Sequence, residues 1–358
     1  MKKKHIWILF IFTKFFYMFI AIAFISKVTT LGDTFDYFYL TKPQEGSFPL
    51  LLLNSTYWMN LLGHNLYLIM GEYLANIPFI FLSVYGIYYP IKKMKLTTKQ
   101  LAFLLILLSF PSFGIWTSIC SKESVGVFFM GIILGYIIDL FEKRRKYPNL
   151  LELFAFYLLL IFKTQYAPAV FAIIIFIKLS QAFHLRKNGK FFLFIFSIIF
   201  VLILAYIVRD YMQFIADIMP THFSAHSKST RENTIWIEKY DIYYHALQGM
   251  FIAFIGPTFS EAMDNNMQLI VFLESVVILI ILFWILIKTF FRKKINIYIF
   301  SLSFLGTFLI LFGHYPFGVL NPGSAIRYRE NFYAFLIIFL YYLYIKSRNN
   351  SFYKQKRI

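Results

Sequence analysis

Long apolar runs separated by short polar segments recur along the whole 358-residue chain. A helix needs about 20 residues to cross about 30 Å of hydrocarbon, and many of these runs are that long. No long alternation of apolar and polar positions, which is typical of strands, competes with them. The pattern therefore predicts an all-α fold, a polytopic bundle of transmembrane helices with outer-face loops.

We expect about ten spans of this length. Their predicted bounds are 5–27, 65–90, 100–119, 124–141, 149–163, 165–183, 191–212, 266–290, 296–314 and 332–346. The first run follows three lysines as in a signal peptide, but its apolar part is too long and no small-residue cleavage site follows, so we expect a retained helix. No repeat or linker divides the sequence, which predicts a single integral membrane domain over 1–358.

Composition agrees with a bilayer environment. The chain is 59% hydrophobic and only 15% charged, more apolar than a soluble domain could bury. Cys120 is the single cysteine, so no internal disulfide and no cysteine-based metal site are expected.

The net charge of +18 is concentrated in alternate predicted loops. The basic clusters lie at 2–4, 92–99, 143–146, 186–190, 292–294 and 354–357. This positive-inside pattern predicts that both termini are cytoplasmic and that the number of spans is even. Membrane spans interrupt the charges, so they form no continuous patch and nucleic acid is not an expected partner.

With this topology, five segments face outward, at 28–64, 116–123, 163–166, 210–265 and 315–331. The first and fourth are large enough to shape a pocket. Within them, 48–63 and 246–259 are apolar enough to lie at the interface or to re-enter the membrane.

Asp33 and Asp36 follow the first predicted span, three residues apart and next to Gly32. In a helix they would face the same way. One interpretation is a pair of interfacial acids. The other is that one of them, preferably Asp33, is a catalytic base, since a carboxylate near the low-dielectric boundary can have the raised pKa that a base needs.

Three further charged residues lie at two junctions between consecutive predicted spans. Lys122 and Glu123 form either an interfacial pair, with the lysine reaching water, or a phosphate contact oriented by the glutamate. Lys163 is either a hairpin tip or a charge at depth, and Pro168 starts or kinks the next helix.

Arg327 and Arg329 precede the last predicted span, after a Pro-Gly turn on the outer side. Arginines there run against the topology bias. They either anchor the helix at headgroups or bind phosphate, for which the planar guanidinium is suited. The outer segments also contain His222, His226 and His245. Their spacing does not match the patterns with which histidines on a helix bind zinc, so no metal site is expected.

The 32–33, 121–123, 256–257 and 323–329 segments together resemble O-antigen polymerase-like and related multi-span, lipid-dependent glycosyltransferases of bacteria. The resemblance covers nearly the whole chain in layout. It implies a reaction on the outer face of the bacterial inner membrane, with a glycan carried on polyprenyl pyrophosphate as donor, membrane lipid around the protein, and polysaccharide-assembly proteins as partners.

By the same resemblance, Asp33 would be the base, with Asp36 beside it. Arg327 and Arg329 would bind pyrophosphate, supported by Lys122 and Lys163, without a metal or cofactor. The long outer stretch departs from many O-antigen polymerases because it lacks a clear basic motif, unless Lys228 and Arg231 serve.

Two other classes stay open. A flippase or transporter of lipid-linked oligosaccharide would carry charges through the bilayer depth, where Glu72 and Glu274 are candidates. A membrane acyltransferase would use a buried histidine, for which His314 is the candidate.

Overall fold

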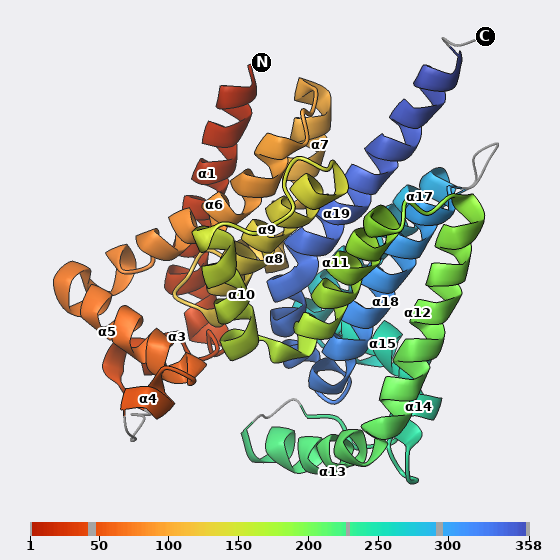
Figure 1. The fold of residues 1–358 in the computed structure, drawn as a ribbon. Coiled ribbons are helices and arrows are strands. Elements are labelled where there is room, and N and C mark those ends of the chain that lie inside the picture. Colours follow the sequence, from red (N-terminus) through yellow and green to blue (C-terminus); the bar gives the residue numbers. More distant parts are fainter. Residues whose placement is uncertain (1, 42–47, 227–229, 291–295, 356–358) are drawn as a thin grey trace. The chain divides into compact units, whose positions relative to one another are not determined.

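The computed structural model describes residues 2–41, 48–226, 230–290 and 296–355. Every regular element in these ranges is helical (Figure 1), so the all-α prediction is confirmed for them. Contacts divide the chain into two compact units, unit 1 with Met1–Thr164 and Glu330–Ile338, and unit 2 with Gln165–Arg329 and Phe339–Ile358. Each unit is described by itself, and the single domain stays a prediction.

Unit 1 begins with one long apolar helical stretch and contains both bent and short helices. Its elements are α1 (Lys3–Ile20), η1 (Ala21–Ile25), α2 (Ser26–Val28), α3 (Thr34–Tyr39), α4 (Phe48–Leu51), α5 (Ser55–Leu74), α6 (Ile77–Lys93), α7 (Thr98–Leu107), α8 (Pro111–Trp116), α9 (Lys122–Phe141) and α10 (Leu150–Phe162).

Unit 2 contains most of the second half of the chain, and α19 contributes to both units. Its elements are η2 (Thr164–Tyr166), α11 (Ala167–Ala182), α12 (Lys187–Ile207), α13 (Arg209–His226), α14 (Asp241–Tyr244), α15 (Ala246–Ile255), α16 (Phe259–Asp264), α17 (Asn266–Phe290), α18 (Ile297–Gly318) and α19 (Pro322–Gln355).

Six helical stretches in the described part of the chain are long and apolar enough to cross a membrane, which makes this a multi-pass membrane protein. They are Lys3–Val28, Lys122–Phe141, Thr164–Ala182, Lys187–Ile207, Asn266–Phe290 and Ile297–Gly318. A seventh span results if α5 and α6 are counted as one bent span. The ten-span count and the sidedness stay predictions.

The single helix predicted at 65–90 is instead two helices, α5 and α6, bent by 94°. Gly71 has a φ of 73°, which interrupts α5, and Pro78 lies in the first turn of α6. Proline cannot donate a backbone hydrogen bond and so favours a helix start at this point. The apolar run is continuous through the bend, which explains why hydrophobicity did not reveal it.

Two other predicted spans differ from the helices of the structure, and a third agrees with a helix that is short for a span. The 100–119 run is divided into α7 and α8, and α8 starts at Pro111. The helix at 149–163 is α10, whose 13 residues are about 20 Å long, shorter than the hydrocarbon layer. The last helix, predicted at 332–346, begins earlier, at Pro322.

Helix α9 is the central element of unit 1. Its apolar window is 94% buried, whereas that of α12 is 6% buried and faces outward. A Cβ added to Gly131 of α9 would lie 1.9 Å from the Gly86 carbonyl oxygen of α6, so only glycine permits this approach of the two backbones. Small residues at helix contacts are typical of membrane proteins.

At the C-terminal end of α9, two of the basic clusters seen in the sequence meet. Asp139 accepts hydrogen bonds from Lys93 at 2.7 Å and from Arg145 at 2.7 Å, and Arg144 donates to it at 3.1 Å. Arg145 also donates to Glu152 at 2.6 Å. We call these five residues the basic end cluster.

The start of α1 lies at the same end of unit 1. The rings of Trp7 and Tyr88 are 5.4 Å apart, and the Lys92 ammonium lies 5.9 Å from the Tyr88 ring centroid. Three basic segments therefore share one end, as the predicted common side requires. The basic residues at 292–294 and Arg357 lie outside the described residues.

In unit 2, Arg231 joins three parts of the chain. Its guanidinium forms a two-pronged pair with Glu261, at 2.7 and 2.6 Å, and donates to the carbonyls of Val319 and Gly256. Burial opposes the charged form of Glu261, but hydrogen bonds from Arg231 and Thr258 outweigh it and lower the Glu261 pKa below its ordinary 4.5. Arg231 therefore has a structural role, because its side chain holds these three segments of unit 2 together.

We expect Glu261→Gln to destabilise the protein by about 2 kcal/mol at pH 7, because hydrogen bonds to a charged group are lost. A lowered folded-state pKa contributes stability above the unfolded pKa, and this contribution disappears as pH falls through the folded value. The difference from the parent should thus shrink below pH 4.5. Thermal unfolding in detergent between pH 7 and 3.5 measures it.

The matched control is Glu232→Gln, because Glu232 is a nearby exposed carboxylate. It should change stability little at either pH. An equal loss for the two variants, or a Glu261→Gln loss that is independent of pH, would contradict the assignment.

Candidate functional site

Residues 117–124 join α8 to α9 and include the first residues of α9; this largely buried polar segment is called the 117–124 turn. The Ser121 side chain caps α9 by accepting from the Ser124 amide at 3.1 Å, and it donates to the Trp116 carbonyl at 2.6 Å. The Cys120 amide donates to the Asn76 side chain at 2.7 Å. Buried peptide groups must be paired, and side chains from elsewhere in unit 1 pair with those of the turn.

Lys14 reaches this turn from within α1. It is 1% exposed, its ammonium donates to the Thr117 hydroxyl, and it lies 4.3 Å from the Phe113 ring centroid. Glu330, which is fully buried in the same unit, interacts with it electrostatically. An ionisable side chain inside a candidate membrane span is a reason to propose a functional site.

Sequence reasoning missed Lys14 and Glu330. The signal for Lys14 was present, since it is the basic residue in the middle of the apolar run at 5–27. Glu330 carried no such signal because it was placed in an outer loop.

Asp36 lies on α3, and Asp33 is the N-cap residue immediately before it. Because Asp33 is just outside the helix at Thr34–Tyr39, the expectation that the two carboxylates face the same way stays a prediction. Asp33 accepts from the Tyr37 hydroxyl at 3.2 Å, and both carboxylates are half-buried. The Thr34 hydroxyl donates to the Cys120 carbonyl at 3.0 Å, which fixes α3 directly against the 117–124 turn.

Lys122, Glu123 and Lys163 surround the start of α9. Lys122 is half-buried, and its ammonium donates to the Thr56 hydroxyl of α5 at 2.8 Å. Glu123 and Lys163 are buried, with 4.0 Å between the carboxylate and the ammonium. Lys163 therefore lies at depth rather than at an exposed hairpin tip.

Unit 1 thus holds five of the seven sequence-predicted residues, on the 117–124 turn or on segments that contact it. They are Asp33, Asp36, Lys122, Glu123 and Lys163. The basic end cluster lies at the opposite end of α9, whose 20 residues separate the two by about 30 Å. Chemically, the site combines half-buried carboxylates and a half-buried lysine with charges enclosed behind them.

Arg327 and Arg329 belong to unit 2. The segment predicted as an outer loop at 315–331 is largely helical, because α18 continues to Gly318 and α19 begins at Pro322. Residues two apart on a helix are about 200° apart around its axis, so the two arginines point in different directions.

Arg329 is fully buried. Its guanidinium donates to the Phe254 carbonyl at 3.1 Å and to Ser275 at 2.6 Å, and it lies 3.8 Å from Glu274. Arg327 is half-buried. The phosphate-binding role of both arginines stays a prediction. The contacts of Arg329 give this residue another role, as an interior partner of Glu274.

The contacts of the remaining histidine candidate and of an exposed charge pair complete the description. His314 is buried and its Nε2 lies 3.0 Å from the Ala253 carbonyl. Arg209 lies 4.0 Å from Asp210 in an exposed pair. Within the described residues, no group of three or more histidines, cysteines or acids could hold a metal ion. Lys228 lies outside the described residues.

No family model, curated protein or solved structure matches the chain. The functional argument therefore depends on the residues and geometry of the chain itself.

We expect Glu123→Gln and Lys163→Met to be strongly coupled. Each single change should cost about 3–5 kcal/mol because it leaves an uncompensated buried charge, and the double variant should cost clearly less than the sum. Unfolding can be followed by thiol labelling of Cys120, the only cysteine, which is buried in the same turn.

Arg209 and Asp210 form the matched control pair. They have the same 4.0 Å separation, but Asp210 is 72% exposed. Their double-mutant cycle should give under about 1 kcal/mol of coupling. Similar coupling in the two pairs would contradict the interior role of Glu123 and Lys163.

We expect Arg329→Ala to lower the amount of folded protein in the membrane, because it strands Glu274 in the interior at a cost of about 3–5 kcal/mol. Arg329→Met combined with Glu274→Gln should recover much of this loss, since the charges are removed together. Arg327→Ala is the comparison and should leave the protein level unchanged. Membrane abundance and thermal unfolding measure both. A loss for Arg327→Ala as large as for Arg329→Ala would disprove this distinction.

Proposed function

We propose that this protein is a glycosyltransferase of the bacterial inner membrane that transfers or polymerises glycan units carried on polyprenyl pyrophosphate, on the outer face, for surface polysaccharide. The observation that carries the proposal is the cluster at the 117–124 turn, where carboxylates and lysines from four parts of unit 1 meet. The resemblance of the short sequence motifs to O-antigen polymerase-like enzymes supports the substrate class.

In the proposed reaction, a sugar hydroxyl of the acceptor attacks the anomeric carbon of the donor. The bond between that carbon and the pyrophosphate oxygen breaks, and the leaving group keeps the electron pair. Asp33 takes the hydroxyl proton, a role typical of a half-buried carboxylate. Gly32 precedes it with a φ of 58°, and a residue without a side chain lets the substrate approach.

Lysines stabilise the departing pyrophosphate in this proposal. Lys122 is half-buried and so can contact a phosphate, whereas Lys14 and Lys163 act from the interior. Preorganised charges in a site of low dielectric contribute strongly to stabilising a developing anion. The lysines supply this charge, so the proposal invokes no metal or cofactor. Arg327 stays a proposed phosphate contact.

The alternative is a flippase or transporter of lipid-linked oligosaccharide. The buried positions of Lys14 in α1 and Glu274 in α17 favour it, because transporters place ionisable residues within their spans. An acyltransferase has less support, because the Nε2 of its required histidine, His314, is already engaged by the Ala253 carbonyl.

The test is deletion of the gene, followed by analysis of surface polysaccharide and of extracted lipid-linked intermediates. A polymerase or transferase predicts loss of long chains with single units accumulating on the outer side. Accumulation on the inner side would establish the transporter instead, and unchanged glycan would refute both.

Complementation of the deletion strain then tests the base. Asp33→Asn should lower glycan synthesis by about 100-fold or more while leaving the protein in the membrane, because a positioned base contributes at least this factor. Asp36→Asn should have a smaller effect. The control is Asp217→Asn, an exposed carboxylate of α13. Full activity of Asp33→Asn would remove Asp33 from the mechanism.

A further inference from the structure

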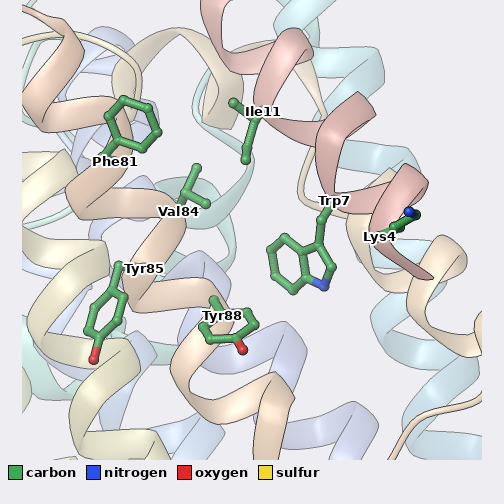
Figure 2. Close-up of a pocket in the computed structure, with 7 residues that line it drawn as sticks. All are labelled: Lys4, Trp7, Ile11, Phe81, Val84, Tyr85 and Tyr88. Atoms are coloured by element: carbon green, nitrogen blue, oxygen red, sulfur yellow. The ribbon is translucent and has the colours of Figure 1, made fainter. Parts of the chain in front are cut away.

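A groove with a volume of about 530 Å³ lies between α1 and α6 in unit 1 (Figure 2). Ligand pockets typically have volumes of about 300–1,000 Å³ and mostly apolar walls. The residues that line the groove include Lys4, Trp7, Ile11, Phe81, Val84 and Tyr88. The groove is thus an apolar channel with a single charged residue among those shown.

The groove opens at the surface, since Phe81 in its wall is 51% exposed, and the exposed surface of α1 beside it is also apolar. Ile8, Leu9 and Phe12 on that helix are 48%, 60% and 67% exposed. Since the Lys3–Val28 stretch is a candidate span, these side chains face lipid, and a lipid molecule can enter the groove from the side. No soluble ligand would need so apolar an approach.

Positive charge marks one end of this groove. Lys4 lines it, and Lys92 packs on the Tyr88 ring at 5.9 Å, at the end of unit 1 that also holds the basic end cluster. Lysines with aromatic rings beside an apolar groove match a phosphate headgroup above a hydrocarbon chain. The complementarity is to an anionic lipid, because a zwitterionic headgroup offers no net charge to the lysines.

We propose that this groove is a binding site for an anionic phospholipid of the leaflet on the basic side, with its phosphate at Lys4 and one acyl chain along Ile11, Phe81 and Val84. The residues that line the groove lie outside the 117–124 turn, although Ser83, the neighbour of Val84, donates to the Thr117 carbonyl at 2.8 Å. The lipid site therefore does not depend on the glycosyltransferase proposal.

The test uses the purified full chain in neutral detergent, with phosphatidylglycerol or phosphatidylcholine that carries a photoreactive group in one acyl chain. Cross-linked peptides are mapped by mass spectrometry. We expect phosphatidylglycerol to label the α1 and α6 segments that line the groove well above α12, which is the background because its surface is almost entirely exposed. Phosphatidylcholine should label the groove no more than α12.

Two variants sharpen the result. Lys4→Glu should weaken groove labelling by phosphatidylglycerol at least fivefold, the approximate effect of one lysine near an anionic surface. Lys99→Glu, an exposed lysine at the start of α7 with the same change of charge, should leave it intact. Ile11→Trp should lower labelling by filling the groove, with unchanged Cys120 thiol protection showing that unit 1 is folded.

The proposal is overturned if phosphatidylcholine labels the groove as strongly as phosphatidylglycerol, which would indicate a general lipid contact. Equal effects of Lys4→Glu and Lys99→Glu would indicate unspecific attraction to the basic end, and would overturn it too. Labelling of α12 as strong as that of the groove would show that no bound lipid is selected.

Discussion

The structure of unit 1 depends on pairing the polar groups of a turn that is buried inside it. The 117–124 turn connects two helices where solvent cannot reach its peptide groups, and an unpaired polar group there would cost several kcal/mol. Its partners come from α1, α3 and the α5–α6 bend, through Lys14, Thr34 and Asn76. The α5–α6 bend and α3 thus both contribute side chains that pair with the polar groups of this turn.

Helix α9 can occupy the centre of unit 1 because of its close packing and the contacts at its two ends. A helix enclosed on all sides must approach its neighbours closely, and Gly86 and Gly131 allow α6 to do so. At its other end, Asp139 and the surrounding cations neutralise one another. The helix is thus fastened by hydrogen bonds at one end and by ion pairs at the other.

The class of fold could be predicted from the sequence because hydrophobic length is a strong signal in membrane proteins. The runs at 124–141, 165–183 and 266–290 agree closely with helices of the structure. The break after α5 could not be predicted in this way, because the apolar run continues through it and only Asn76 and Pro78 indicate a turn. Hydropathy reports how strongly side chains prefer an apolar environment, and it carries no information on where the backbone changes direction.

Proline was misleading near the C-terminus. Pro322 and Gly323 were interpreted as part of a loop, yet proline is favoured at the first position of a helix, and α19 starts there. Arg329 was therefore placed outside the membrane, where the topology bias made it unusual. Its position beside Glu274 resolves that conflict, because a buried arginine paired with a carboxylate is not subject to the loop rule.

Local sequence could indicate that Asp33, Lys122 and Lys163 are unusual, but not that they meet. Their proximity depends on hydrogen bonds between segments far apart in the chain, such as the one from Thr34 to Cys120.

The structure also separates charges that can touch a substrate from charges that cannot. Half-buried Asp33 and Lys122 can contact a substrate, whereas buried Glu123 and Lys163 can act only through the field they create. Because charges enclosed in low dielectric interact strongly, the interior pair would influence a reaction at Asp33 and Lys122, if the proposed function holds, without contacting the substrate.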